Sequence, residues 1–168
     1  MIRVLGIDPG IASCGWALLR VTPGRKPFCE ASGSWKSTPA DGDDAKRIAG
    51  LGMLFGGLAR GVDLVAIEAW TFQRQQGNAR RANSKAGTTT PRVIERMRTL
   101  CDLRKIPCVE VHQQTAKSAM GVRTKDGVKR AVAVLVDHEH AAPNKHAIDA
   151  VAVGVAGARK WMAEGGRA

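Results

Sequence analysis

Two apolar runs in this sequence each end in a single acidic residue. The run VLGID ends at Asp8, where Pro9 and Gly10 break the chain, and the run LVAIE ends at Glu68. A run that is apolar along its whole length is typical of a parallel strand covered on both faces, because an exposed face would alternate with polar residues. The sequence therefore predicts a layered α/β domain with two carboxylates at strand ends.

Three predicted strands fill the first part of the chain. They cover residues 2–7, 13–21 and 28–35, with the turn-forming segments DPGIA and TPGRKP between or beside them. Strands this close together, joined by short turns, indicate an antiparallel meander. Two further strands are predicted at 63–70 and within 106–113.

Helical periodicity marks four later segments. These are residues 43–60, 91–105 with Pro91 at the first position, 125–138, and 143–162 opened by Pro143. Strands followed by helices that alternate with strands predict an α/β fold: a mixed five-stranded sheet, antiparallel meander plus parallel strands, flanked by helices. We expect residues 1–168 to form one domain, with a disordered tail at about 163–168.

The charge of the chain favours a polyanionic partner. Lysine and arginine number 26 against 15 acidic residues, a formal net charge of +11, and nucleic acid is the leading candidate. The N-terminal apolar run is too short for a signal peptide and no membrane span stands out, so a cytoplasmic protein without membrane attachment is expected. Cys14, Cys29, Cys101 and Cys108 lack zinc-site spacing and are expected as small buried residues.

The acids at the strand ends suit a metal site. Carboxylates at the rim of an apolar core repel one another unless a proton or a cation intervenes, and hard oxygen ligands favour Mg²⁺ or Mn²⁺. His146 and Asp149 are three residues apart on the last helix, so they share a face. Capping and turn roles stay open on the residues alone: Asp8 bracing its turn, Glu68 pairing with an arginine, and His146 capping backbone.

Three segments, GIDPGIASCGWALL, DLVAIEAWTF and NKHAIDAVAVG, in that order and at these intervals, resemble the RuvC-type Holliday-junction resolvases of the RNase H-like superfamily. The resemblance spans nearly the whole chain. It implies that Asp8, Glu68, His146 and Asp149 are catalytic and bind two Mg²⁺ ions, for which Mn²⁺ substitutes, and that His146 replaces an aspartate of many members. The implied reaction nicks four-way junctions symmetrically, leaving 5′-phosphate and 3′-hydroxyl ends.

The resemblance also implies DNA contacts. Phe72 is the better candidate to stack on an unpaired base, with Trp70 as the alternative, and Lys129 is the best match for a lysine beside the scissile phosphate, followed by Lys117. Solvated surface charge is the alternative for the basic side chains. The DNA-binding surface would comprise Phe72, Arg74, Arg80, Arg81, Lys85, Arg92, Lys117, Lys125 and Arg130.

The family acts as a homodimer, because two symmetric nicks need two sites related by a two-fold axis. The apolar stripe at 93–103 would serve either this interface or the core, and branch-migration machinery is a further possible partner. Two alternatives stay open: a nuclease acting on forks, other branched DNA or RNA–DNA hybrid, and a non-catalytic branched-DNA-binding protein. The two-domain ATPase fold of actin and Hsp70 needs a much longer chain.

Overall fold

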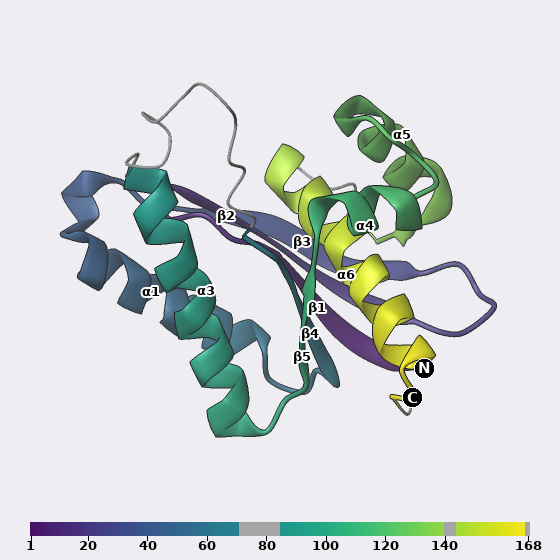
Figure 1. The fold of residues 1–168 in the computed structure, drawn as a ribbon, viewed down its shortest axis with the longest axis horizontal. Helices are drawn as coiled ribbons and strands as arrows, with labels where there is room; N and C mark the ends of the chain where they lie inside the picture. Colours follow the sequence, from purple (N-terminus) through teal and green to yellow (C-terminus); the bar gives the residue numbers. More distant parts are fainter. Residues whose placement is uncertain (71–84, 140–143, 167–168) are drawn as a thin grey trace.

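A six-stranded mixed sheet lies between two layers of helices in the computed structural model, which describes residues 1–70, 85–139 and 144–166, with the backbone alone at 85–88 (Figure 1). The strand order is β5-β4-β1-β2-β3-β6. The strands are β1 (Ile2–Asp8), β2 (Ser13–Val21), β3 (Phe28–Lys36), β4 (Leu64–Glu68), β5 (Cys108–Val111) and β6 (Asp137–His138).

The strand pairing confirms the predicted fold class. Strands β1, β2 and β3 form the antiparallel meander, and β4 and β5 extend the sheet in parallel from β1. The sheet has one strand more than predicted, because β6 pairs in parallel with β3 through two residues. A two-residue strand is too short to show a periodic pattern.

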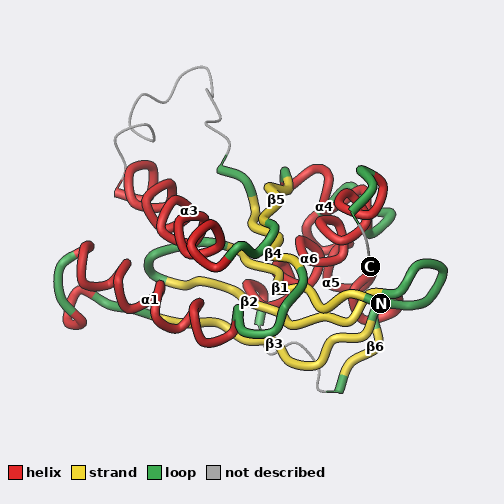
Figure 2. Tube along the Cα trace, turned by 90° about the horizontal axis from the view of Figure 1, so that it is seen from below, coloured by secondary structure: helices red, strands yellow, loops and turns green. Residues whose placement is uncertain are grey.

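The helices divide between the two faces of the sheet (Figure 2). Helices α1 and α3 cover one face, and α4, α5 and α6 cover the other. Their bounds are α1 (Asp44–Leu58), α3 (Lys85–Arg104), α4 (Gln113–Ala119), α5 (Lys125–Leu135) and α6 (Lys145–Ala163), with a short 3₁₀ helix η1 at Pro39–Asp41. The segment that forms α4 was not predicted as a separate helix.

Helix α3 corrects one prediction. Pro91 lies inside this helix, not at its first position. An interior proline loses one backbone hydrogen bond, but the turn before it is held in the core by the buried Thr89 and Thr90. The apolar stripe that follows, including Val93 and Met97, is also buried against the sheet and α1. Val93, Ile94, Met97 and Cys101 are therefore core within the monomer, whereas Leu103, at the end of the predicted stripe, is 73% exposed.

Helix α6 crosses the sheet at very short range. A Cβ atom added at Gly6 of β1 would overlap the Ala150 carbonyl, and one added at Gly15 of β2 would overlap the His146 carbonyl. Because glycine has no side chain at these two positions, the first turns of α6 lie directly on the strands. His146 and Asp149 are thereby brought to the end of β1.

The cysteines behave as predicted. Cys14, Cys29 and Cys101 are buried, Cys108 is half-buried, and all four are free thiols. Burial raises the pKa of the Cys14 thiol to about 12, so this side chain stays neutral. Among the described residues, no helix has the length and apolar character needed to cross a membrane.

Candidate active site

The four residues predicted to be catalytic gather at one edge of the sheet. Asp8 ends β1 and Glu68 ends β4, and these strands are parallel neighbours with Ile7 opposite Ile67. His146 and Asp149 project from the first two turns of α6, which lies against the same strands. The fold thus brings together side chains from three elements that lie 60 to 141 residues apart in the sequence.

Direct contacts join these side chains. The Nδ1 atom of His146 lies 2.7 Å from Oδ2 of Asp8, and the Asp8 and Glu68 carboxyl groups share a hydrogen bond. The Asp8 and Asp149 side chains are 17% and 18% exposed, whereas the His146 side chain is 42% exposed. The carboxylates therefore lie below the surface, and the imidazole forms part of the solvent-facing rim.

Crowding of these acids changes their proton affinity. Burial, followed by the negative charge of Asp8, raises the pKa of Glu68 to about 8. The same two causes raise the pKa of Asp149, against the opposing charges of Lys125, Lys145 and His146. The cluster thus carries more negative charge than its protein surroundings neutralise.

The donor chemistry of the cluster fits a hard divalent cation. Its oxygen ligands are those that Mg²⁺ and Mn²⁺ prefer, and a bound cation would relieve the repulsion that raises the two pKa values. Within the described residues, however, no group of three or more His, Cys, Asp or Glu side chains is arranged as a ready coordination shell. Asp8 is instead engaged with His146 and Glu68.

A small pocket with a basic wall adjoins the acids. Its Lys125 Nζ atom lies 4.0 Å from Oδ2 of Asp149, with the Lys125 side chain about half exposed. Lys129 lies one turn further along α5 and lines a neighbouring pocket instead. Lys125, which was predicted as a DNA contact, thus pairs with Asp149, while the role predicted for Lys129 stays a prediction. The pocket is lined by Glu68, Gln113, Ala116, Lys117, Lys125, Val128, Asp149, Ala152 and Val153.

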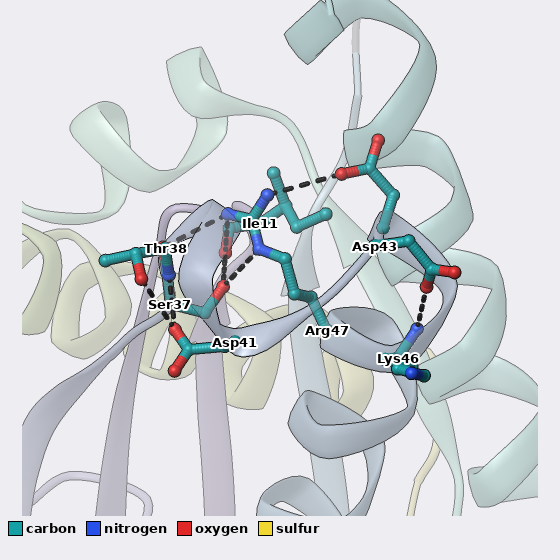
Figure 3. A network of polar contacts seen from close by, with 8 residues as sticks. Ile11, Ser37, Thr38, Asp41, Asp43, Lys46 and Arg47 are labelled. Carbon is teal, nitrogen blue, oxygen red and sulfur yellow. Dashed lines mark hydrogen bonds and ion pairs between the residues drawn. The ribbon is translucent and has the colours of Figure 1, made fainter.

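A buried arginine fixes the loop that follows Asp8 (Figure 3). Arg47 of α1 is 6% exposed, and its guanidinium donates to the Ile11 carbonyl and to both the hydroxyl and the carbonyl of Ser37 at 3.0–3.5 Å. The Ser37 hydroxyl donates to the Ile11 carbonyl at 2.5 Å, and the Ser37 amide donates to the Ala12 carbonyl. The turn after the first catalytic candidate is therefore tied to β3 and α1.

The remaining predicted DNA-binding residues divide into two groups. Phe72, Arg74, Arg80 and Arg81 lie outside the described residues, and Lys85 is described by its backbone alone. Arg92 on α3 and Arg130 on α5 are exposed. Trp70 is 42% exposed just after β4, so it is not packed in the core.

Sequence reasoning missed three polar residues near the acids. Gln113 begins α4 and lines the pocket that contains Glu68. Asn144 caps α6 by accepting from the Ala147 amide, and Lys145 follows it. The capping preference of asparagine before a helix was a usable signal for the start of α6.

Comparison with known proteins identifies the fold. No protein-family model and no curated protein matches the sequence. Among solved structures, RuvC of T. thermophilus in complex with a Holliday junction substrate matches with a TM-score of 0.79 and 19% identity, over 98% of this chain and 97% of that chain. The yeast mitochondrial Holliday junction resolvase Ydc2 matches with a TM-score of 0.67 and 16% identity, over 96% and 79%.

A more distant match is the Fowlpox virus resolvase in complex with Holliday junction DNA, with a TM-score of 0.51 and 8% identity, over 90% of this chain and 95% of that chain. The matches to T. thermophilus RuvC and Ydc2 leave at most 4% of this chain uncovered. The fold anticipated from the three sequence motifs is confirmed.

Proposed function

We propose that this chain, which has the fold of the RuvC resolvases, is a structure-specific endonuclease that cuts four-way DNA junctions by hydrolysing phosphodiester bonds. The observation that carries the proposal is the convergence of Asp8, Glu68, His146 and Asp149 at one sheet edge. Capping or bracing roles do not explain why three carboxyl groups share one partly buried site.

Asp8, Glu68, His146 and Asp149 would hold two Mg²⁺ ions, or Mn²⁺ in their place. When bound, the ions would supply an activated water and charge stabilisation of the leaving 3′ oxygen. The chain's own contribution is to orient the ligands. The hydrogen bond between His146 Nδ1 and Asp8 fixes the imidazole ring, and the hydrogen bonds of Arg47 to Ile11 and Ser37 fix the loop beyond Asp8.

Lys125 is the residue we assign to the phosphate that is cut. Its ammonium group, beside Asp149, would face a phosphoryl group held at the acids, where positive charge offsets the charge that develops on the non-bridging oxygens. Lys117, which lines the same pocket, would assist. The expected products are 5′-phosphate and 3′-hydroxyl ends.

Branched DNA is the proposed substrate, and a homodimer the proposed active form. The net charge of +11 supports a polyanionic partner, and two symmetric nicks need two sites related by a two-fold axis. Forks, other branched DNA and RNA–DNA hybrid are the alternative substrates for the same chemistry. Branch-migration machinery would be a further partner.

The test is cleavage of a synthetic four-way junction beside a linear duplex, a fork and an RNA–DNA hybrid, with Mg²⁺ or Mn²⁺. We expect paired symmetric nicks confined to the junction. The Asp8→Asn variant should lose cleavage by at least ~10²-fold yet keep binding the junction, whereas Asp102→Asn, on the exposed surface of α3, should cut like wild type. Preferred cutting of the fork or hybrid would overturn the substrate, and binding without cutting would indicate a non-catalytic protein.

A further inference from the structure

A second cavity lies beside the acids, between the beginnings of α5 and α6. It is contiguous with the candidate active site, because Lys125 and Asp149 line both this cavity and the pocket that contains Glu68. The two helices pack against each other, and the first turns of both contribute lining residues. The cavity is lined by Lys125, Asp126, Lys129, Asn144, Lys145, Ile148 and Asp149.

The walls of this cavity offer positive charge with little to neutralise it. Three lysines face two acids, and one of the acids, Asp149, belongs to the proposed metal site. Lys125 is 4.0 Å from Asp149. Within the described part of the chain, neither Lys129 nor Lys145 forms an ion pair with a carboxylate, and both are exposed. Their ammonium groups are thus available to an anion.

Helix geometry adds to this charge. Both helices are long, 11 and 19 residues, and both begin at the cavity. Their caps, Thr124 and Asn144, each accept from one amide of the first turn. The other amides of a first helical turn have no partner within the helix, and the helix dipole favours an anion there.

The lining also limits what kind of anion fits. Among the described residues that line the cavity, Ile148 is the one apolar side chain, the others are charged or polar, and none is aromatic. A nucleotide base would find no surface on which to stack. Lysine side chains and helix amides instead suit a phosphate group without its base.

We infer that this cavity holds a DNA backbone phosphate next to the one that is cut, bound by Lys129 and Lys145. The inference rests on the proposed function and deepens it, since it adds a phosphate contact on the α5–α6 side of the acids. Occupation of this site would fix the register of the strand so that the neighbouring phosphate lies at Lys125.

The test uses DNA binding in a cleavage-deficient background. Asp8→Asn is the parent, and the parent is compared with the same protein carrying Lys129→Ala and Lys145→Ala, by titrating a labelled four-way junction at several salt concentrations. We expect the double substitution to raise the Kd several-fold and to lower the slope of log K against log salt by about 1, because one phosphate contact is lost.

A control removes a positive charge from an exposed site away from the acids. Arg25 lies in the β2–β3 turn, at the other end of the strands, and is exposed. Arg25→Ala should leave the Kd and the salt slope at the parent values. Since Lys129 and Lys145 are exposed, their variants should also unfold at the parent temperature, which a thermal melt checks.

A second arm locates the phosphate. Junctions with a single neutral methylphosphonate at successive positions around the cut should include one position that weakens binding by the parent and leaves binding by the double variant unchanged. Equal methylphosphonate effects in both proteins, or a parent-like Kd and slope in the double variant, would overturn the inference. A parent-like Kd and slope in the double variant would show that the cavity has no role in DNA binding, even if it can bind free phosphate.

The two levels of the proposal fail differently. If the Asp8→Asn parent binds the junction and the lysine variants bind equally well, the inference falls and the proposed function stands. If the parent binds no DNA, both fall. If the parent prefers linear duplex, the junction assignment falls, and the salt slope measured on that duplex still decides whether the lysines hold a phosphate.

Discussion

The carboxyl group of Glu68 gains or loses its proton near neutral pH in the folded protein. Its pKa is raised from 4.5 to about 8 by burial and by the charge of Asp8, so the folded metal-free protein binds a proton that the unfolded chain has already released. Stability must then fall as the pH rises from about 4.5 to about 8. We expect the melting temperature of the metal-free protein to drop by roughly a few degrees across this range.

Glu68→Gln is the informative variant for this prediction. It removes the titrating group while keeping the size of the side chain, so its melting temperature should lack this part of the pH dependence and exceed that of wild type at pH 8. Thermal melts in a chelator, from pH 5 to pH 8, measure both proteins. An identical pH dependence in wild type and Glu68→Gln would show that this carboxyl group is not the one that titrates.

Lys125 and Lys129 show how the position of a lysine on α5 determines whether it meets Asp149. Lys125, Val128 and Val132 follow each other at steps of three and four, so they share one face of α5, and both valines are buried. Lys129, four residues after Lys125, lies close to the same face, but in the structure it lines the neighbouring cavity while Lys125 pairs with Asp149. The helix at 125–138 was predicted from the sequence, but the spacing did not show which of its lysines meets Asp149, because that depends on how α5 packs against α6.

At the scale of the elements, the position of α6 decides whether the acids meet. The helix lies on the strands because Gly6 and Gly15 leave room for its backbone. Gly6→Ala would place a methyl group against the Ala150 carbonyl, and we expect a loss of stability of about 1–3 kcal/mol from overpacking. Displacement of α6 would also carry His146 and Asp149 away from β1, so the cleavage rate should fall. Urea unfolding and junction cleavage measure the two effects.

The same chemical change in open space is the control. Gly50 lies in α1 with nothing near the position of an added Cβ, so Gly50→Ala should stabilise the protein by about 0.5–1 kcal/mol through helix propensity. Cleavage should be unchanged. Equal stability effects at Gly6 and Gly50 would show that close approach of α6 is not what Gly6 provides.

The contact between α1 and the loop after β1 gives another prediction. Arg47→Ala leaves the Ser37 carbonyl without its guanidinium donor and the Ile11 carbonyl with the Ser37 hydroxyl alone, which should cost about 1–3 kcal/mol. Arg47→Lys should recover part of this loss, because it restores one donor. Arg60→Ala removes an exposed arginine near the end of α1 and should unfold at the wild-type urea concentration. A wild-type urea midpoint for Arg47→Ala would show that the contacts of Arg47 with Ile11 and Ser37 do not stabilise the fold.

The elements differed in how well the sequence predicted them. The meander and β4 were predicted within one or two residues, because apolar runs and turn residues have strong local signals. Helix α3 was predicted to begin at Pro91, since proline's preference for the first turn is local whereas the burial of Thr89 and Thr90 depends on the sheet. For the site, the acids at the strand ends were visible in the sequence, but their distances, and the pocket formed by α4 and α5, depend on the packing of α6.

At the scale of the whole molecule, the arrangement of charge is what the proposed substrate requires. Negative charge is concentrated at the ends of β1 and β4, while the chain as a whole carries +11. Basic residues around α4, α5 and the start of α6 can approach phosphates on either side of the acids. A single site of this kind accounts for one nick in one strand, so the resolution of a four-way junction needs two copies of the chain.

Mixed dimers test this requirement. Wild-type and Asp8→Asn chains with different affinity tags are co-expressed, and dimers carrying both tags are purified. These dimers are then incubated with a supercoiled plasmid that contains an extruded cruciform. Two wild-type sites should convert the plasmid to linear DNA, because paired nicks at one junction cut both strands. A mixed dimer has one competent site, so it should yield nicked circles. Linear product from mixed dimers at the wild-type rate would show that one site makes both cuts, and sedimentation as a monomer at concentrations that support cutting would contradict the dimer itself.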